Sequence, residues 1–484
     1  MVKICYFCIM SVKKCVYLGA QCVYALIVLL ALLVFPGASV VPTLLTMLSV
    51  WFVVAICYRY IPWKSDAGWW TLLVSTTVLS VGIIANVCYF TTHSGATTQL
   101  PLLQNPDAWR YYYDALSTMG DANGVPCELK SHGYGLIISW VWQLTGITIV
   151  SPLVLNMLLM LFSIIVSGGI AWRLLQGVTS KSGQWIASCA MIMTASVCYF
   201  LNSGTLLLKE AGVIFAFSLI AFSFISLNET SLPKWIDVVL FFIGAVLVAM
   251  LRTNYLIMPI VGVAILLRWN KWCIIKSSTM LVITVACWIG VSAWLYSSYS
   301  EASEIASKIM SGYGLNNSFF LDNLDHRTYN AIVEGYFDFP WWKKVFFLPM
   351  SAAVQYLIPL PWGFCDDIQF GYSLAYAHIS YPWYLVGGLI LYFVVCHMRK
   401  APRTLAQFTM WGGLMWLVPA FLFAGTVSRY ALPMLPILVP GAVYVVAKWR
   451  EFNKTQLKWC FGLYALFLFV GLIAGYIVQK GVAL

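Results

Sequence analysis

The sequence predicts an all-α, polytopic membrane protein, and two properties of the chain carry that prediction. Of its 484 residues, 61% are hydrophobic and only 9% are charged, whereas soluble domains carry about 25% charged residues. Apolar runs such as Cys22–Phe35, Val238–Leu251 and Leu463–Val478 approach or fill the roughly 20 residues that a helix needs to cross a bilayer core. We therefore expect a single integral-membrane domain over residues 1–484.

The apolar runs predict about twelve full spans and two partial or interfacial helices. The N-terminal run is expected to be a retained span, because no small-x-small cleavage site follows it. The apolar runs that give this approximate total number thirteen, and they lie near residues 16–35, 40–57, 69–90, 152–172, 184–201, 206–227, 235–251, 254–270, 277–295, 378–397, 406–424, 430–447 and 458–478.

The two partial helices, 134–150 and 345–362, follow from the distribution of positive charge. If either were a full span, basic loops containing Arg173 or Arg399 would fall outside the cytoplasm, against the positive-inside tendency of membrane proteins. Trp140 and Trp142 suit a membrane interface in the first, and Pro349 interrupts the second.

The net charge of +11 is therefore read as a topology signal, and it does not indicate nucleic-acid binding. The fourteen cysteines are scattered, mostly inside apolar runs. That pattern predicts small core residues, not a zinc or redox site.

Two long hydrophilic segments, 91–133 and 296–344, fall on the outer side of this topology, together with most of the acidic residues. Neither is long enough for a large independent domain. Any functional site is therefore expected where these loops meet the outer ends of the helices.

The first outer loop contains the stretch NPDAWRYYYDAL, Asn105–Leu116, which predicts a short helix. Asn105 suits the N-cap and Pro106 the first helical position. Asp107, Arg110, Tyr111 and Asp114 then share one face over roughly 10 Å. Arg110 could simply neutralise two acids on an interfacial helix, or the face could belong to a catalytic site.

Five further residues are candidates because of their position at outer helix ends. Lys209 and Glu210 are expected about one turn inside the span 206–227, where ionisable groups often line a functional site; a structural pair is the alternative. Arg252 lies in an outer turn that could be a plain hairpin. Arg429 and Tyr430 begin a late span, where an arginine could bind a phosphate or act as an interfacial anchor.

The order of these motifs resembles that of the membrane glycosyltransferases of superfamily C (GT-C), which include protein O-mannosyltransferases and the lipid A aminoarabinose transferase. The motifs, spread over most of residues 69–447, are NPDAWRYYYDA, HGYGLIISWVWQLTG (His132–Gly146), LLLKEA, YLIPLPW (Tyr356–Trp362) and SRYALPMLP (Ser428–Pro436). The chain departs from that family in three respects: two extra early spans, first-loop acids seven residues apart, and no soluble domain after the last span.

The resemblance implies a GT-C-like fold and transfer of a sugar from a polyprenyl-phosphate donor on the outer side of the membrane. The acceptor would be a glycan or lipid-linked molecule of the cell envelope, as in O-antigen modification, at the bacterial inner membrane. It implies Asp107 as the base and Arg429 as the phosphate ligand. Asp114, Lys209, Glu210 and His132 are secondary candidates for orienting acceptor or phosphate.

Whether a divalent metal is bound stays open, and Asp107, Asp114 and Glu210 are the carboxylates that would bind it. No other cofactor is expected. A polysaccharide polymerase or ligase that uses polyprenyl-diphosphate saccharides is a second hypothesis. A flippase or transporter is a third, although it would predict polar groups near the bilayer midplane and an internal repeat.

Overall fold

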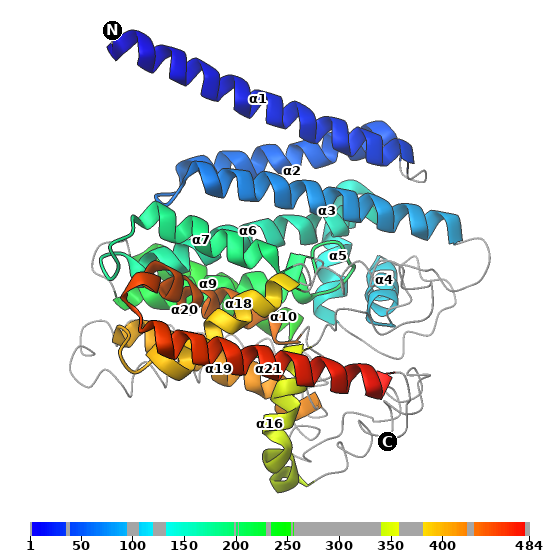
Figure 1. Ribbon diagram of the computed structural model, residues 1–484. Helices are drawn as coiled ribbons and strands as arrows, with labels where there is room; N and C mark the ends of the chain where they lie inside the picture. The colour runs from blue at the N-terminus through cyan, green and yellow to red at the C-terminus, as the bar shows by residue number, and fades with distance from the viewer. Residues whose placement is uncertain are drawn as a thin grey trace. The chain divides into compact units, whose positions relative to one another are not determined.

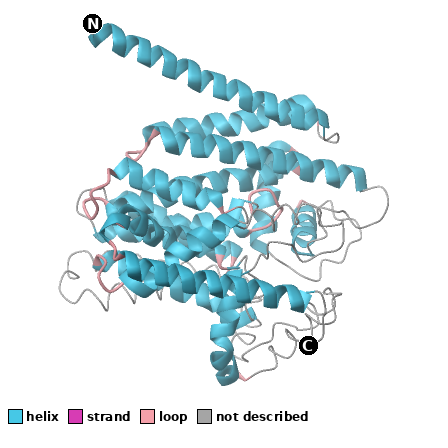
Figure 2. Ribbon diagram, viewed as in Figure 1, coloured by secondary structure: helices cyan, strands magenta, loops and turns pink. Residues whose placement is uncertain are grey.

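The computed structural model describes residues 2–34, 39–93, 106–119, 132–197, 200–201, 203–228, 234–252, 255, 340–357, 381–423 and 430–479. Throughout these residues the chain forms helices joined by turns and loops, with no strand (Figure 2). The all-α prediction is confirmed for this part of the chain. The chain divides into two compact units, described separately below: unit 1 holds Met1–Ile165 with Leu201–Ala211, and unit 2 holds Val166–Phe200 with Gly212–Leu484.

Unit 1 begins with three long helices, α1 (Val2–Val34), α2 (Val40–Tyr60) and α3 (Asp66–His93) (Figure 1). They pack on one another through few polar contacts. The Tyr24 hydroxyl of α1 donates to the carbonyl of Met47 at 3.2 Å and lies 3.1 Å from the Ser80 hydroxyl of α3. Because water is excluded here, this pairing satisfies a buried hydroxyl that would otherwise be costly.

Unit 1 continues with α4 (Pro106–Thr118), α5 (His132–Thr145) and the first part of α6 (Val150–Leu175). Helix α4 begins at Pro106, as the sequence predicts. Helix α5 ends early because Gly146 adopts a left-handed backbone with φ of 80°. Its 14 residues extend about 21 Å, which is too short to cross a bilayer core of roughly 30 Å.

Unit 2 contains the end of α6, α7 (Gly183–Ser196), most of α9 (Glu210–Asn228) and α10 (Lys234–Leu251). Helices α9 and α10 approach closely at Gly244, which has no Cβ. A Cβ at this position would lie 2.8 Å from the carbonyl oxygen of Ala216. The predicted span 184–201 is too long: α7 ends at Ser196, and Val197 is extended, with φ −77° and ψ 92°.

The C-terminal part of unit 2 contains α16 (Trp341–Leu357), α18 (Tyr381–Tyr392), the π-helix η4 (Phe393–His397), α19 (Arg403–Phe423), the short helix η6 (Leu432–Met434), α20 (Leu435–Ala447), η7 (Trp449–Glu451) and α21 (Lys454–Gln479). The sequence predicts a span that begins near residue 430, but helix α20 begins at Leu435. Pro433 and Pro436 lack the N–H groups that a regular helix would need there.

Five helical segments are long and apolar enough to cross a membrane: Cys15–Val34, Val40–Tyr60, Asp66–Cys88, Val150–Leu175 and Lys454–Ala474. Four shorter apolar helices, Glu210–Ile225, Trp235–Leu251, Tyr381–His397 and Leu432–Ala447, also lie within the described residues. Apolar side chains such as Leu463 and Phe469 of α21 are 63% and 64% exposed, as expected where lipid replaces water. Apart from Tyr255, the predicted spans 254–270 and 277–295 lie outside the described residues, so the total of about twelve stays a prediction.

The described cysteines are not the core residues that the sequence predicts. Cys15, Cys22 and Cys57 are exposed, and Cys88, Cys189, Cys396 and Cys460 are half-exposed. A cysteine inside a hydrophobic run can face either other helices or lipid. Its position in the run does not show which of the two it faces.

Candidate functional site

In unit 1, helices α4 and α5 pack so closely that a glycine is required at their contact. A Cβ on Gly135 would lie 2.7 Å from the Cβ of Asp114, shorter than the contacts between side chains in a close-packed interior. Asp114 is buried, with 7% of its surface exposed. The rings of Tyr111 and Tyr134 meet edge to face with centroids 5.0 Å apart, a favourable aromatic geometry.

The segment before α9 is held by two asparagine side chains of unit 1. The Asn156 amide donates to the carbonyls of Leu206 at 2.7 Å and Leu208 at 3.0 Å. Asn86 donates to the carbonyl of Thr205 at 2.8 Å. These carbonyls therefore bond to side-chain amides and not to the helical N–H groups of residues further along.

Because these carbonyls bond to asparagine side chains, the helix begins later than the predicted span 206–227. Helix α9 begins at Glu210, so Lys209 immediately precedes the helix and Glu210 occupies its first position; neither lies one turn inside. A carboxylate at a helix N-terminus is stabilised by the helix dipole. Glu210 is also deeply buried, with 2% of its surface exposed.

Lys209 and Glu210 lie at the same tyrosine pair as Asp114. The Lys209 Nζ is 5.5 Å from the centroid of the Tyr111 ring, within the range of a cation–π interaction. Glu210 acts electrostatically on the hydroxyl of Tyr134, beside the Asn156 side chain. We call Tyr111, Asp114, Tyr134, Lys209 and Glu210 the α4–α5 cluster.

The α4–α5 cluster combines two buried carboxylates, an ammonium and two phenolic hydroxyls. A carboxylate can accept a proton from an attacking hydroxyl, and an ammonium can stabilise a departing anion. The arrangement is therefore chemically competent for group transfer to a hydroxyl. It is equally capable of serving as a structural charge network.

In unit 2, two of the predicted substrate-binding residues stack on each other. Helix α10 ends at Leu251, and the guanidinium carbon of the next residue, Arg252, lies 3.8 Å from the centroid of the Tyr430 ring. Arg252 Nη1 lies 3.4 Å from the Tyr255 hydroxyl, which donates to the carbonyl of Tyr430 at 3.2 Å. We call Arg252, Tyr255 and Tyr430 the arginine–tyrosine cluster.

The side chains of several predicted site residues lie outside the described structure. Asp107 and Arg110 lie in α4 and His132 is the first residue of α5, but their side chains are outside the described structure. Arg429 also lies outside the described residues. Whether Arg110 pairs with Asp107 thus stays a prediction.

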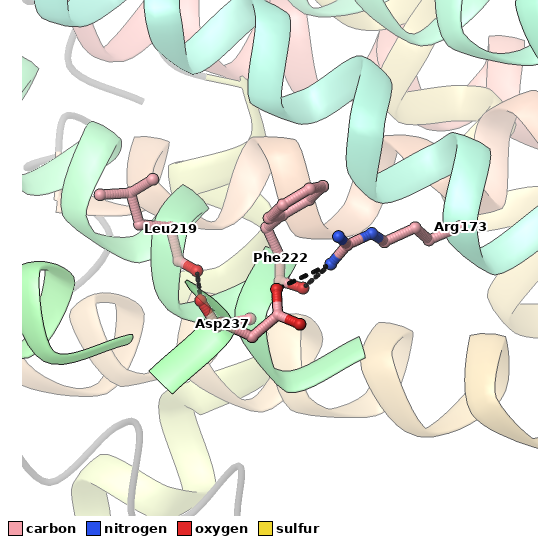
Figure 3. Close-up of polar contacts among 5 residues, drawn as sticks. Arg173, Leu219, Phe222 and Asp237 are labelled. Carbon is pink, nitrogen blue, oxygen red and sulfur yellow. Dashed lines mark hydrogen bonds and ion pairs between the residues drawn. The ribbon is translucent and has the colours of Figure 1, made fainter. Parts of the chain in front are cut away.

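The residues predicted from the sequence do not include Tyr134, Asn86 and Asn156, which belong to this region. Each lies inside an apolar run, where a polar side chain is a signal of a specific contact. They also do not include a buried ion pair in unit 2, between Arg173 of α6 and Asp237 of α10, with 3.5 Å between Nη1 and Oδ1 (Figure 3). The same Nη1 donates to the Phe222 carbonyl at 2.9 Å.

Among the described residues, no group of three or more histidine, cysteine, aspartate or glutamate side chains is arranged to hold a metal ion. Asp114 and Glu210 are hard oxygen donors of the type that divalent cations accept, but the third predicted carboxylate, Asp107, has no described side chain. Asp114 and Glu210 are thus the described candidates to bind a metal, and chelation experiments test whether one is required.

Comparison of the chain with protein-family models, with curated proteins and with solved structures gives no match.

Proposed function

We propose that this chain is an integral-membrane glycosyltransferase that moves a sugar from a polyprenyl-phosphate donor to a hydroxyl of a glycan or lipid-linked acceptor. The observation that carries the proposal is the α4–α5 cluster. Lys209 and Glu210 lie at the buried Tyr111–Tyr134 pair, and Asp114 lies at the adjacent contact of α4 with Gly135 of α5. The sequence predicted Asp114 and the Lys209–Glu210 pair from two distant stretches of the chain.

The proposed reaction is a direct displacement at the anomeric carbon. A carboxylate, Asp107 or Asp114, accepts the proton of the acceptor hydroxyl as its oxygen bonds to the anomeric carbon. The bond from that carbon to the phosphate oxygen breaks, and polyprenyl monophosphate leaves. Inversion is expected, so one base and charge stabilisation of the leaving group suffice.

The positive groups have distinct proposed roles. Lys209, in the α4–α5 cluster, stabilises negative charge that develops during transfer. Arg252 and Tyr430, together with Arg429, bind the lipid phosphate, because a guanidinium can make two parallel hydrogen bonds to it. His132 and Arg110 are proposed to orient the acceptor.

The same proposal includes a GT-C-like fold of about twelve spans, with the active site on the extracytoplasmic face of a bacterial inner membrane. The apolar helices support insertion in a membrane. The positive-inside distribution of lysine and arginine supports the orientation.

The decisive experiment reconstitutes the full-length protein in liposomes with a panel of radiolabelled polyprenyl-phosphate hexoses and pentoses and an envelope glycolipid extract. Release of polyprenyl monophosphate together with labelled acceptor supports the proposal. Consumption of diphosphate-linked saccharides with chain lengthening would instead indicate a polymerase or ligase. Movement of unchanged donor across the vesicle membrane would indicate a flippase.

Amide variants identify the base once activity is measured. Replacement of the base, by Asp107→Asn or Asp114→Asn, is expected to lower turnover by about 10²-fold or more, given the usual contribution of general-base catalysis. If Asp107→Asn, Asp114→Asn and Glu210→Gln all transferred sugar at the wild-type rate, the proposed chemistry would be wrong. Parallel assays with and without EDTA decide whether a divalent metal is required.

A further inference from the structure

Two half-exposed cysteines of unit 2 lie in direct contact. Cys396 belongs to the π-helix η4, and Cys460 lies in the second turn of α21. Their Sγ atoms are 3.4 Å apart, and both are free thiols. A disulfide has an S–S length of about 2.05 Å, so closure needs a movement of only about 1.4 Å.

The contact is not an isolated approach, because it ends a regular seam between α18 and α21. Residues at four-residue spacing on α18 and η4 meet α21 in register. The Tyr464 hydroxyl donates to the Tyr384 carbonyl, and a Cβ on Gly388 would lie 2.7 Å from the Tyr464 ring. One turn on, Tyr392 faces Phe461, with ring centroids 6.3 Å apart.

This register fixes which sulfurs can meet. As residue numbers rise from Tyr384 to Cys396, the contacting residues of α21 fall from Tyr464 to Cys460, so the two helices run antiparallel along the seam. Cys396 therefore faces Cys460 at the end of the seam.

Basic residues lie close to both cysteines along the chain. Arg399 and Lys400 follow Cys396, and Lys454 and Lys458 precede Cys460. By the positive-inside tendency they mark this end of the helices as cytoplasmic, where thiols are ordinarily kept reduced.

We propose that Cys396 and Cys460 form a redox modification site that takes a peroxide as its two-electron oxidant. The Cys460 thiolate attacks one peroxide oxygen, the O–O bond breaks, and water leaves after protonation, so Cys460 becomes a sulfenic acid. The Cys396 thiol then attacks the Cys460 sulfur, the S–S bond forms, the S–O bond breaks, and a second water leaves. Two thiols lose two electrons and two protons, and one peroxide becomes two waters.

Cys460 is assigned the first step, and labelling of a sulfenic acid in Cys396→Ser tests that order. The resulting bond joins α21 covalently to η4, which continues α18, and holds α21 in place. The inference does not depend on the proposed transferase activity.

The test treats the full-length protein in detergent micelles with hydrogen peroxide, blocks the remaining thiols with N-ethylmaleimide, and maps linked peptides by mass spectrometry without reduction. A peptide pair joining Cys396 to Cys460 is expected, reversed by dithiothreitol. It should persist in the control variant Cys189→Ser and vanish in Cys396→Ser and in Cys460→Ser. In Cys396→Ser, dimedone should label Cys460 as a sulfenic acid.

A second measurement separates proximity from oxidation. Dibromobimane, which bridges two neighbouring thiols without an oxidant, should link Cys396 to Cys460 in untreated protein. If dibromobimane links the pair but peroxide leaves both thiols alkylatable, the modification site is rejected. Failure of both reagents, or random linkage among all cysteines, also overturns the proposal.

Discussion

The guanidinium of Arg252 stacks on the ring of Tyr430 with 3.8 Å between the guanidinium carbon and the ring centroid. The Tyr255 hydroxyl, which lies at Arg252 Nη1, donates to the Tyr430 carbonyl. Stacking fixes the plane of the guanidinium, and Nη1 at its edge donates to the Tyr255 hydroxyl. That geometry distinguishes arginine from lysine, whose ammonium presents no plane.

The first prediction therefore compares Arg252→Lys with Arg252→Ala in the reconstituted transferase. Loss of a charge-assisted hydrogen bond costs about 1.5–3 kcal/mol, so Arg252→Ala should raise the KM for donor by roughly 10-fold or more. Arg252→Lys should restore only part of that loss. If both variants lower the thermal midpoint but leave donor KM unchanged, the arginine–tyrosine cluster is purely structural.

A second prediction concerns the close contact between α4 and α5. Gly135→Ala places a methyl group 2.7 Å from the Cβ of Asp114, so the helices must separate, at about 1–3 kcal/mol for an overpacked interior. Both stability and turnover should fall, because Asp114 is displaced. Gly462→Ala in α21 is the matched control: no atom lies within 4 Å of its Cβ, so thermal unfolding should be unchanged or slightly improved. Equal effects of the two substitutions would refute the close-contact explanation.

A third prediction concerns the two asparagines that hold the segment before α9. Asn156 donates to two carbonyls and Asn86 donates to one, and loss of each hydrogen bond costs about 0.5–1.5 kcal/mol. Asn156→Leu should therefore destabilise the protein more than Asn86→Leu, measured by thermal unfolding in detergent. It should also lower turnover, because Lys209 and Glu210 follow the held carbonyls directly. The reverse order of stability would contradict this account.

The sequence predicted the helical class and most helix positions because apolar length and charge distribution are local properties of the chain. It predicted α4 from Asn105 and Pro106 for the same reason. It misplaced the start of α9, because the carbonyls of Leu206 and Leu208 are captured by Asn156, which lies about fifty residues earlier in the chain. No local sequence pattern predicts such a long-range hydrogen bond.

The candidate site was predictable only in part, for a similar reason. Ionisable residues in an apolar chain are conspicuous, so Asp114, Lys209, Glu210 and Arg252 could be nominated individually. Their partners are aromatic or amide side chains, such as Tyr134 and Tyr255, which are common in membrane helices. Which of these meets which ion depends on helix packing, and the sequence alone does not give that packing.

The last prediction concerns the buried Arg173–Asp237 pair, whose side chains are 4% and 2% exposed. The Arg173 guanidinium also lies 3.5 Å from the centroid of the Phe222 ring and donates to the Phe222 carbonyl, so this one side chain connects α6, α9 and α10. Removing one member leaves the other as an uncompensated buried charge. Asp237→Ala and Arg173→Met should therefore each destabilise the protein by about 3–5 kcal/mol.

The double variant Arg173→Met with Asp237→Leu removes both charges and replaces them with apolar groups of similar size. Because a buried ion pair is often no more stable than a well-packed apolar pair, the double variant should recover most of the thermal midpoint lost in Asp237→Ala. Additive losses in the double variant, measured in the same detergent, would show that the charges do not act as a pair.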